Sequence, residues 1–217
     1  MITFIRALVT LLAYSALSLS ASAQQADRDL RSPTAFIYQD FQPTRINLKD
    51  RRFTRVEANI FLKNGRLIYR HKGKVLEAST DNIVSIVFAD SIRYIPIGLQ
   101  VARVVTERDT NAILCITTID QKRLKSETTG GDNLPYFELE DLGLFIETDG
   151  SKSASREYPI KHNYYIKHGE VIFPANQTQF RRHLNPSLKE AFRLLMHEKY
   201  WSWGDEPSLI MLLDYLN

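Results

Sequence analysis

The stretch VEANIFLKNGRLIYRHKGKVLEA (residues 56–78) decides the fold class of this chain. Apolar runs alternate in it with two short polar breaks, and each break contains a glycine. Such runs favour β-strands, and glycine favours turns because it adopts positive φ without steric cost. The stretch therefore predicts strands joined by turns at Lys63-Asn64-Gly65 and at His71-Lys72-Gly73. Asn-Gly is also the preferred pair for a tight type I′ turn.

The same pattern continues toward the C-terminus. The runs IVSIVFA, RYIPI, LQVARVVTE and NAILCITTI read as further strands, with a turn at Asp109-Thr110-Asn111. Short strands without intervening helices predict an antiparallel meander, either as a sheet or as a partly closed barrel. We expect this β-rich body to span residues 41–174. The polar segment QKRLKSETTGGDNLP (residues 121–135) lacks periodicity and predicts an exposed loop.

Helical spacing replaces strand patterns after Pro174, and we expect two or three short helices in residues 175–217. One is predicted near residues 177–184. Asn185-Pro186 provides a helix cap followed by proline at the first helical position, and Asp205 can cap the last helix. The apolar residues at helical spacing are Leu188, Ala191, Phe192 and Leu195, then Leu209, Leu212, Leu213 and Leu216. The predicted fold class is therefore α+β.

The N-terminus has the layout of a secretory signal peptide. Arg6 precedes the apolar run ALVTLLAYSALS, and small residues at Ala21 and Ala23 follow. We expect residues 1–23 to be removed and residues 24–40 to form a flexible leader. No other stretch is apolar enough to span a membrane, so the processed chain is predicted to be periplasmic or extracellular.

Charge is nearly balanced over the chain, with 28 Lys and Arg against 25 Asp and Glu. It is unevenly placed, because residues 45–74 contain ten basic residues but only Asp50 and Glu57 as acids. This segment is either a basic face for an anionic partner or a set of solvated strand faces. No nucleic-acid-binding motif is present, so we expect no nucleic-acid partner.

The stretch HNYYIKHGEVIF (residues 162–173) has two histidines, but in one strand they lie about 20 Å apart, too far for one metal ion. We interpret it as two strands and a turn at His168-Gly169. Cys115, the only cysteine, is predicted to be a buried, inert thiol. No metal-binding, nucleotide-binding or nucleophile motif is present, so we predict no catalytic residue, metal site or cofactor.

Two groups of residues remain as candidates for ligand binding. Glu138 and Glu140 share a strand face at a spacing that permits glycoside hydrolysis. Tyr164, Trp201 and Trp203 offer rings that stack on sugars or lipids, or that seal a sheet–helix interface.

The order of these features resembles a group of exported bacterial proteins with a β-rich body and a short helical tail. The matching parts are residues 56–78, IVSIVFADSIRYIPI, and the segment from YYIKHGEVIFPANQTQFRRHL through LLDYLN. This resemblance implies a bacterial envelope location and brings no known activity. We expect a non-enzymatic module that binds an envelope protein or envelope ligand. The alternatives are a glycan- or peptide-acting hydrolase and a carrier of a small apolar ligand.

Overall fold

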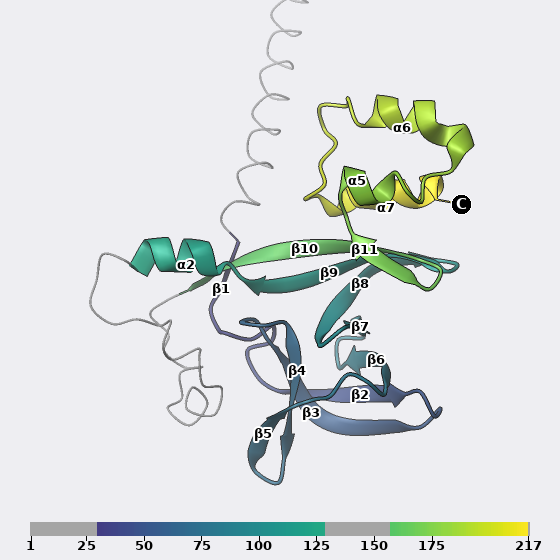
Figure 1. The fold of residues 1–217 in the computed structure, drawn as a ribbon. Helices are drawn as coiled ribbons and strands as arrows, with labels where there is room; N and C mark the ends of the chain where they lie inside the picture. The colour runs from purple at the N-terminus through teal and green to yellow at the C-terminus, as the bar shows by residue number, and fades with distance from the viewer. Residues whose placement is uncertain (1–29, 129–156, 217) are drawn as a thin grey trace, which may run out of the picture. The chain divides into compact units, whose positions relative to one another are not determined.

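The computed structural model describes residues 30–128 and 157–216 (Figure 1). The chain divides into two compact units, and the second runs from Ser32 to Asn217. This second unit contains the strands from β2 onward and the described helices. The predicted signal peptide, Glu138 and Glu140 lie outside the described residues.

Antiparallel strands dominate the described chain and form one large open sheet. The strands are β1 (Arg31–Ser32), β2 (Gln42–Leu48), β3 (Phe53–Phe61), β4 (Arg66–His71), β5 (Lys74–Glu77), β6 (Ile83–Phe88), β7 (Arg93–Ile97), β8 (Gln100–Arg108), β9 (Asn111–Ile119), β10 (Tyr158–His168) and β11 (Val171–Pro174). The helices are α2 (Gln121–Thr128), α5 (Gln177–Phe180), η3 (Pro186–Leu188), α6 (Lys189–Leu195), α7 (Glu206–Met211) and η4 (Leu212–Tyr215). This confirms the predicted α+β class.

The sheet consists of two meanders that meet at β2 and β6. Its strand order is β10-β9-β8-β7-β6-β2-β3-β4-β5, and β11 pairs with the outer side of β10. Ile46 of β2 faces Ile86 of β6 where the two meanders join. The antiparallel meander is thus confirmed with one departure: β6 follows β5 in the chain but pairs with β2, beyond β4 and β3.

The turn between β3 and β4 differs from the predicted type. Strand pairing stops at Phe61 and Arg66, which leaves a loop of four residues, and of these only Gly65 has positive φ (70°). Gly65 lies close to β9, because a Cβ atom there would be 3.1 Å from the Ile116 side chain. Its carbonyl accepts a hydrogen bond of 2.9 Å from Val101 N. The type I′ prediction was wrong, because docking of the loop on β8 and β9 sets its shape.

Helices cover one face of the β8–β11 part of the sheet (Figure 1). A buried apolar cluster joins them to it, and its members are Ile113, Ile166, Phe173, Phe180, Leu184, Phe192, Leu195, Leu209, Leu212, Leu213 and Leu216. The predicted helical stripes therefore face the sheet, except that Ala191 is exposed. Two ion pairs, Arg103–Glu206 and Arg108–Asp214, also tie β8 to the helical segment.

The predicted helix caps are present at both sites. Asn185 accepts a hydrogen bond from Ser187 N, and Asp205 accepts one of 2.9 Å from Ser208 N. Each is followed by a helix with proline in its first turn. The sequence rules for caps therefore hold in this segment.

Two predictions need correction in the described residues. The C-terminal part of the expected flexible leader is packed in the core: Ala35 and Phe36 are buried, and Ile37 N donates to Ile60 O at 3.0 Å. Part of the expected exposed loop, residues 121–128, is helix α2. The Asp120 carboxylate accepts bonds from Lys122 N and Arg123 N and so begins this helix.

Candidate ligand-binding site

A pocket of about 670 Å³ lies among the C-terminal helices, and both tryptophans of the chain line it. Their ring centroids are 4.6 Å apart and the rings are nearly perpendicular, at 83°. We call this site the tryptophan pocket, and its lining residues are Gln177, Arg181, Arg193, Met196, His197, Trp201, Ser202, Trp203 and Gly204.

The loop that carries the tryptophans is held at both ends. Trp201 N donates to Glu198 O at 3.2 Å, just beyond α6. Ser202 N donates to Ser208 Oγ at 3.2 Å, and the same hydroxyl donates to the Asp205 cap of α7. The Trp203 ring packs edge-on against Phe180, at 6.2 Å between centroids. Both rings are thus fixed against the buried cluster while they border the pocket.

The ionisable side chains that line the tryptophan pocket are all of basic residue types. They are Arg181, Arg193 and His197, and no Asp or Glu belongs to the described lining. Glu190 binds the Arg193 guanidinium through both carboxylate oxygens, at 2.6 to 3.1 Å. These hydrogen bonds raise the pKa of Arg193 and lower that of Glu190. Within the described residues, Arg181 has no ion pair, so its charge is available to an anion.

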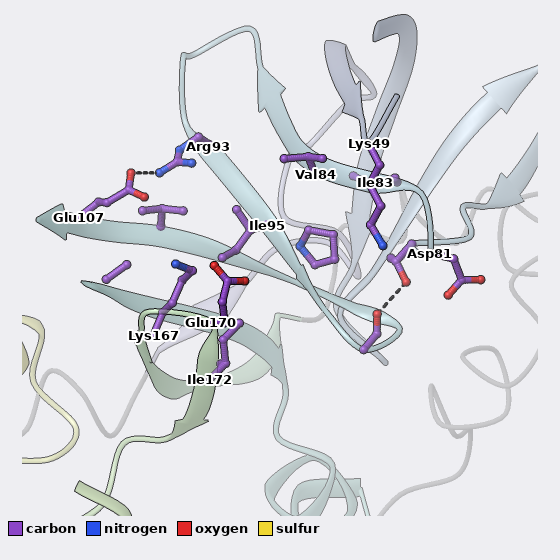
Figure 2. A pocket seen from close by; sticks show the side chains of 15 residues that line it. Lys49, Asp81, Ile83, Val84, Arg93, Ile95, Glu107, Lys167, Glu170 and Ile172 are labelled. Carbon is purple, nitrogen blue, oxygen red and sulfur yellow. Dashed lines mark hydrogen bonds and ion pairs between the residues drawn. The ribbon is translucent and has the colours of Figure 1, made fainter. Parts of the chain in front are cut away.

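A second pocket, of about 500 Å³, lies against β6 to β8 and the β10–β11 hairpin (Figure 2). Its apolar lining includes Ile83, Val84, Ile95, Val104 and Ile172. Its charged residues are Lys49, Asp81, Arg93, Glu107, Lys167 and Glu170. Bases and acids are equal in number, and Arg93 pairs with Glu107. This lining favours neither sign of charge and differs from the apolar cavity that a carrier of apolar ligands would need.

A third, smaller pocket of about 220 Å³ contains Cys115. The Thr117 hydroxyl lies 3.9 Å from the sulfur and 2.9 Å from Nδ1 of His162. Burial raises the pKa of the Cys115 thiol from 9.0 to about 11, although Thr117 and Arg103 act in the opposite direction. Such a thiol is protonated at neutral pH and is a poor nucleophile.

The histidines singled out in the sequence do not form a metal site. His162 and His168 lie on β10, where His162 bonds Thr117 and His168 Nδ1 lies 2.8 Å from Asn111 Oδ1. His183 stacks on Phe173 at 4.2 Å, and burial lowers its pKa. In the part of the chain that the structure describes, no group of three or more His, Cys, Asp or Glu could hold a metal ion.

The structure separates the predicted site residues into three groups. Trp201 and Trp203 meet in the tryptophan pocket. Tyr164 lies on β10 under the helices, where its hydroxyl donates to Glu206 at 3.3 Å, so it belongs to the sheet–helix interface. The pair Glu138 and Glu140 falls outside the described residues and stays a prediction.

Sequence reasoning missed the basic residues of the tryptophan pocket. Arg193, His197 and Trp201 follow one another at intervals of four residues, but this spacing does not put them on one helix face, because α6 ends at Leu195. Arg181 gave no signal either, since it lines the pocket from the C-terminal end of α5.

Comparison with protein-family models, with curated proteins and with solved structures finds no match for this chain. Among the described residues, no helix has the length and apolar character needed to cross a membrane.

Proposed function

We propose that this chain is a non-enzymatic binding protein of the bacterial cell envelope, and that it holds an acidic sugar in the tryptophan pocket. The observation that carries this proposal is the combination of two tryptophans with Arg181, Arg193 and His197 around one pocket. Tryptophan rings stack on the apolar faces of sugars, and guanidinium groups bind carboxylates through paired hydrogen bonds. A volume of about 670 Å³ lies in the range of small-molecule sites.

Intrinsic tryptophan fluorescence provides a test of this proposal. Trp201 and Trp203 are the chain's only tryptophans, so intrinsic tryptophan fluorescence reports on the pocket alone. The chain from residue 24, which retains the whole unit from Ser32, would be titrated with N-acetylmuramic acid and with N-acetylglucosamine. The two sugars differ by a carboxylate-bearing group. We expect a saturable change with the acid and a much weaker one with the neutral sugar.

Two variants test which residues recognise the ligand. Arg181→Gln removes a charge that has no ion pair among the described residues, and we expect affinity for the acid to fall about tenfold or more. Tyr200→Ala is the matched control, because Tyr200 is next to Trp201 but 84% exposed and outside the pocket lining. The proposal fails if neither sugar changes the fluorescence, or if Arg181→Gln binds the acid as well as the parent chain does.

A further inference from the structure

The hairpin of β2 and β3 carries a concentrated positive charge. We call the following set the basic hairpin: Arg45, Lys49, Arg51, Arg52, Phe53 and Arg55. All six side chains are exposed. Asp50 is the only acid between Arg45 and Arg55, and it is already bound by Arg52, with a hydrogen bond of 2.6 Å. The other four cations make no ion pair with any described residue.

Phe53 is the exposed centre of this surface. Phe53 is 49% exposed, whereas phenylalanine is among the residue types most often buried. The Arg45 guanidinium carbon lies 4.3 Å from the ring centroid and that of Arg55 lies 5.3 Å from it. The Phe53 ring is therefore in cation–π contact with two guanidinium groups, that of Arg45 on β2 and that of Arg55 on β3.

Arg45 and Arg55 are also direct cross-strand partners. Like charges at such positions destabilise a strand pair, and neither arginine forms an ion pair with a described residue. An anionic partner would relieve this repulsion. The arrangement thus has the charge complementarity of a surface that meets anions.

The shape of the basic hairpin indicates what kind of anion it meets. Arg45, Phe53 and Arg55 line none of the pockets described above, and the β2–β3 turn extends beyond the neighbouring strands in Figure 1. A projecting tip suits a flat partner better than a ligand that must be enclosed. An exposed phenylalanine beside Lys and Arg suits the boundary between headgroups and acyl chains, and the cations favour anionic headgroups.

We propose that the basic hairpin binds the surface of a lipid bilayer that contains anionic headgroups. Phe53 enters the headgroup layer, and the surrounding cations contact lipid phosphates. This is a peripheral contact, distinct from ligand binding in the tryptophan pocket, and either proposal stands without the other.

Vesicle co-sedimentation of the chain from residue 24 tests the proposal. The vesicles contain phosphatidylcholine alone, or with roughly one-third phosphatidylglycerol. We expect binding to the anionic vesicles only, and we expect it to weaken strongly when salt rises to about 0.5 M, because salt screens exposed charges. Arg45→Gln with Arg55→Gln should reduce the partition coefficient about 20- to 30-fold, since each cation contributes about fivefold.

Two further variants separate a local contact from general charge and from misfolding. Lys189→Gln with Lys199→Gln removes the same charge from exposed positions on the helical segment and should leave binding nearly unchanged. Phe53→Ser keeps every charge and should reduce binding several-fold, with circular dichroism to confirm the fold. The proposal is overturned if anionic vesicles do not bind at low salt, or if both double variants lose binding equally. Hairpin-dependent binding to polyglutamate without binding to vesicles would also overturn it and would indicate an acidic polypeptide as the partner.

Discussion

At the residue scale, Cys115 shows how burial controls chemistry. The side chain is 1% exposed in β9, and burial raises the pKa of its thiol to about 11. The continuous apolar run in NAILCITTI was enough to predict this burial. It did not indicate Arg103 as a neighbour, because that contact depends on the register between β8 and β9, whereas Thr117 lies two residues along the same strand.

We expect Cys115 to resist alkylation in the folded protein at neutral pH and to react at the rate of a free thiol in urea. The physical reason is that neither the thiolate nor a route for the reagent is available while β9 is buried. Labelling with iodoacetamide, followed by mass spectrometry, measures this. Rapid labelling of the folded chain would show that the third pocket opens to solvent.

The same shift has a consequence for stability at alkaline pH. The folded pKa of about 11 lies above the ordinary value of 9.0, so the unfolded chain loses its proton first as pH rises. Stability from this group is therefore intact below about pH 9 and is lost as pH rises toward 11. Urea unfolding of Cys115→Ala beside the parent chain checks the sign, because the variant should lose less stability over this interval.

At the element scale, local signals predicted helix ends better than turn types. Asn185 and Asp205 cap their helices as the sequence indicated, because a cap depends only on residues within one turn. The type of the turn at Gly65 could not be predicted in this way. The Gly65 carbonyl accepts a hydrogen bond from β8, and β9 lies so close that a side chain at this position would contact it. By contrast, Lys72 and Gly73 both have positive φ in an exposed two-residue turn that no other strand contacts closely.

Helix α2 was missed although its sequence carried usable signals. Asp120 caps it, Arg123 and Glu127 form an ion pair one turn apart, and Leu124 is buried. A single apolar residue gives no periodicity, so the segment read as a loop. The lesson is that a short helix can depend on one buried leucine and one cap.

Replacement of the α7 cap tests how much local structure contributes to the tryptophan pocket. Asp205→Ala removes the bond from Ser208 N and should cost about 1 kcal/mol of stability in urea unfolding. The Ser208 hydroxyl also accepts a hydrogen bond from Ser202 N, between the two tryptophans. We therefore expect altered tryptophan emission in the folded variant. Asp40→Ala, an exposed aspartate outside the helices, should change neither quantity appreciably. Equal stability of Asp205→Ala and the parent chain would contradict the role of the cap.

At the scale of the whole molecule, the sequence predicted the strands from β3 onward but neither β2 nor the complete strand order. The hairpins from β3 to β5 and from β6 to β9 are each joined by a short turn, and these pairs were predictable. Strands β9 and β10 also pair, but a long connection that includes α2 separates them in the chain. The pairing of β2 with β6 could not be predicted from a turn, because β3, β4 and β5 lie between the two strands in the chain. The tryptophan pocket was hidden for a similar reason, since residues at α5, on α6 and in the loop between α6 and α7 together form it.

The cluster shared by the sheet and helices predicts cooperative unfolding. Phe180 is fully buried and touches both Phe192 and Trp203, so Phe180→Ala should lower stability by about 3 to 5 kcal/mol. Tryptophan fluorescence reports on the helical segment, and far-ultraviolet circular dichroism reports mainly on the sheet. We expect both midpoints in urea to coincide and to shift together in the variant. Separate midpoints would mean that the helical segment unfolds on its own.

The position of β6 beside β2 also affects the chain during its synthesis. The residues between Leu48 and Ile83 take the ribosome roughly 2 to 7 s to add at about 5 to 20 residues per second. During this interval one edge of β2 has no partner strand, and an unpaired edge is a template for association with other chains. Purified chains truncated near Glu77 should therefore aggregate more readily than chains extended beyond Phe88, which sedimentation of the two fragments can measure. A chaperone that acts on this protein would be needed most in those seconds.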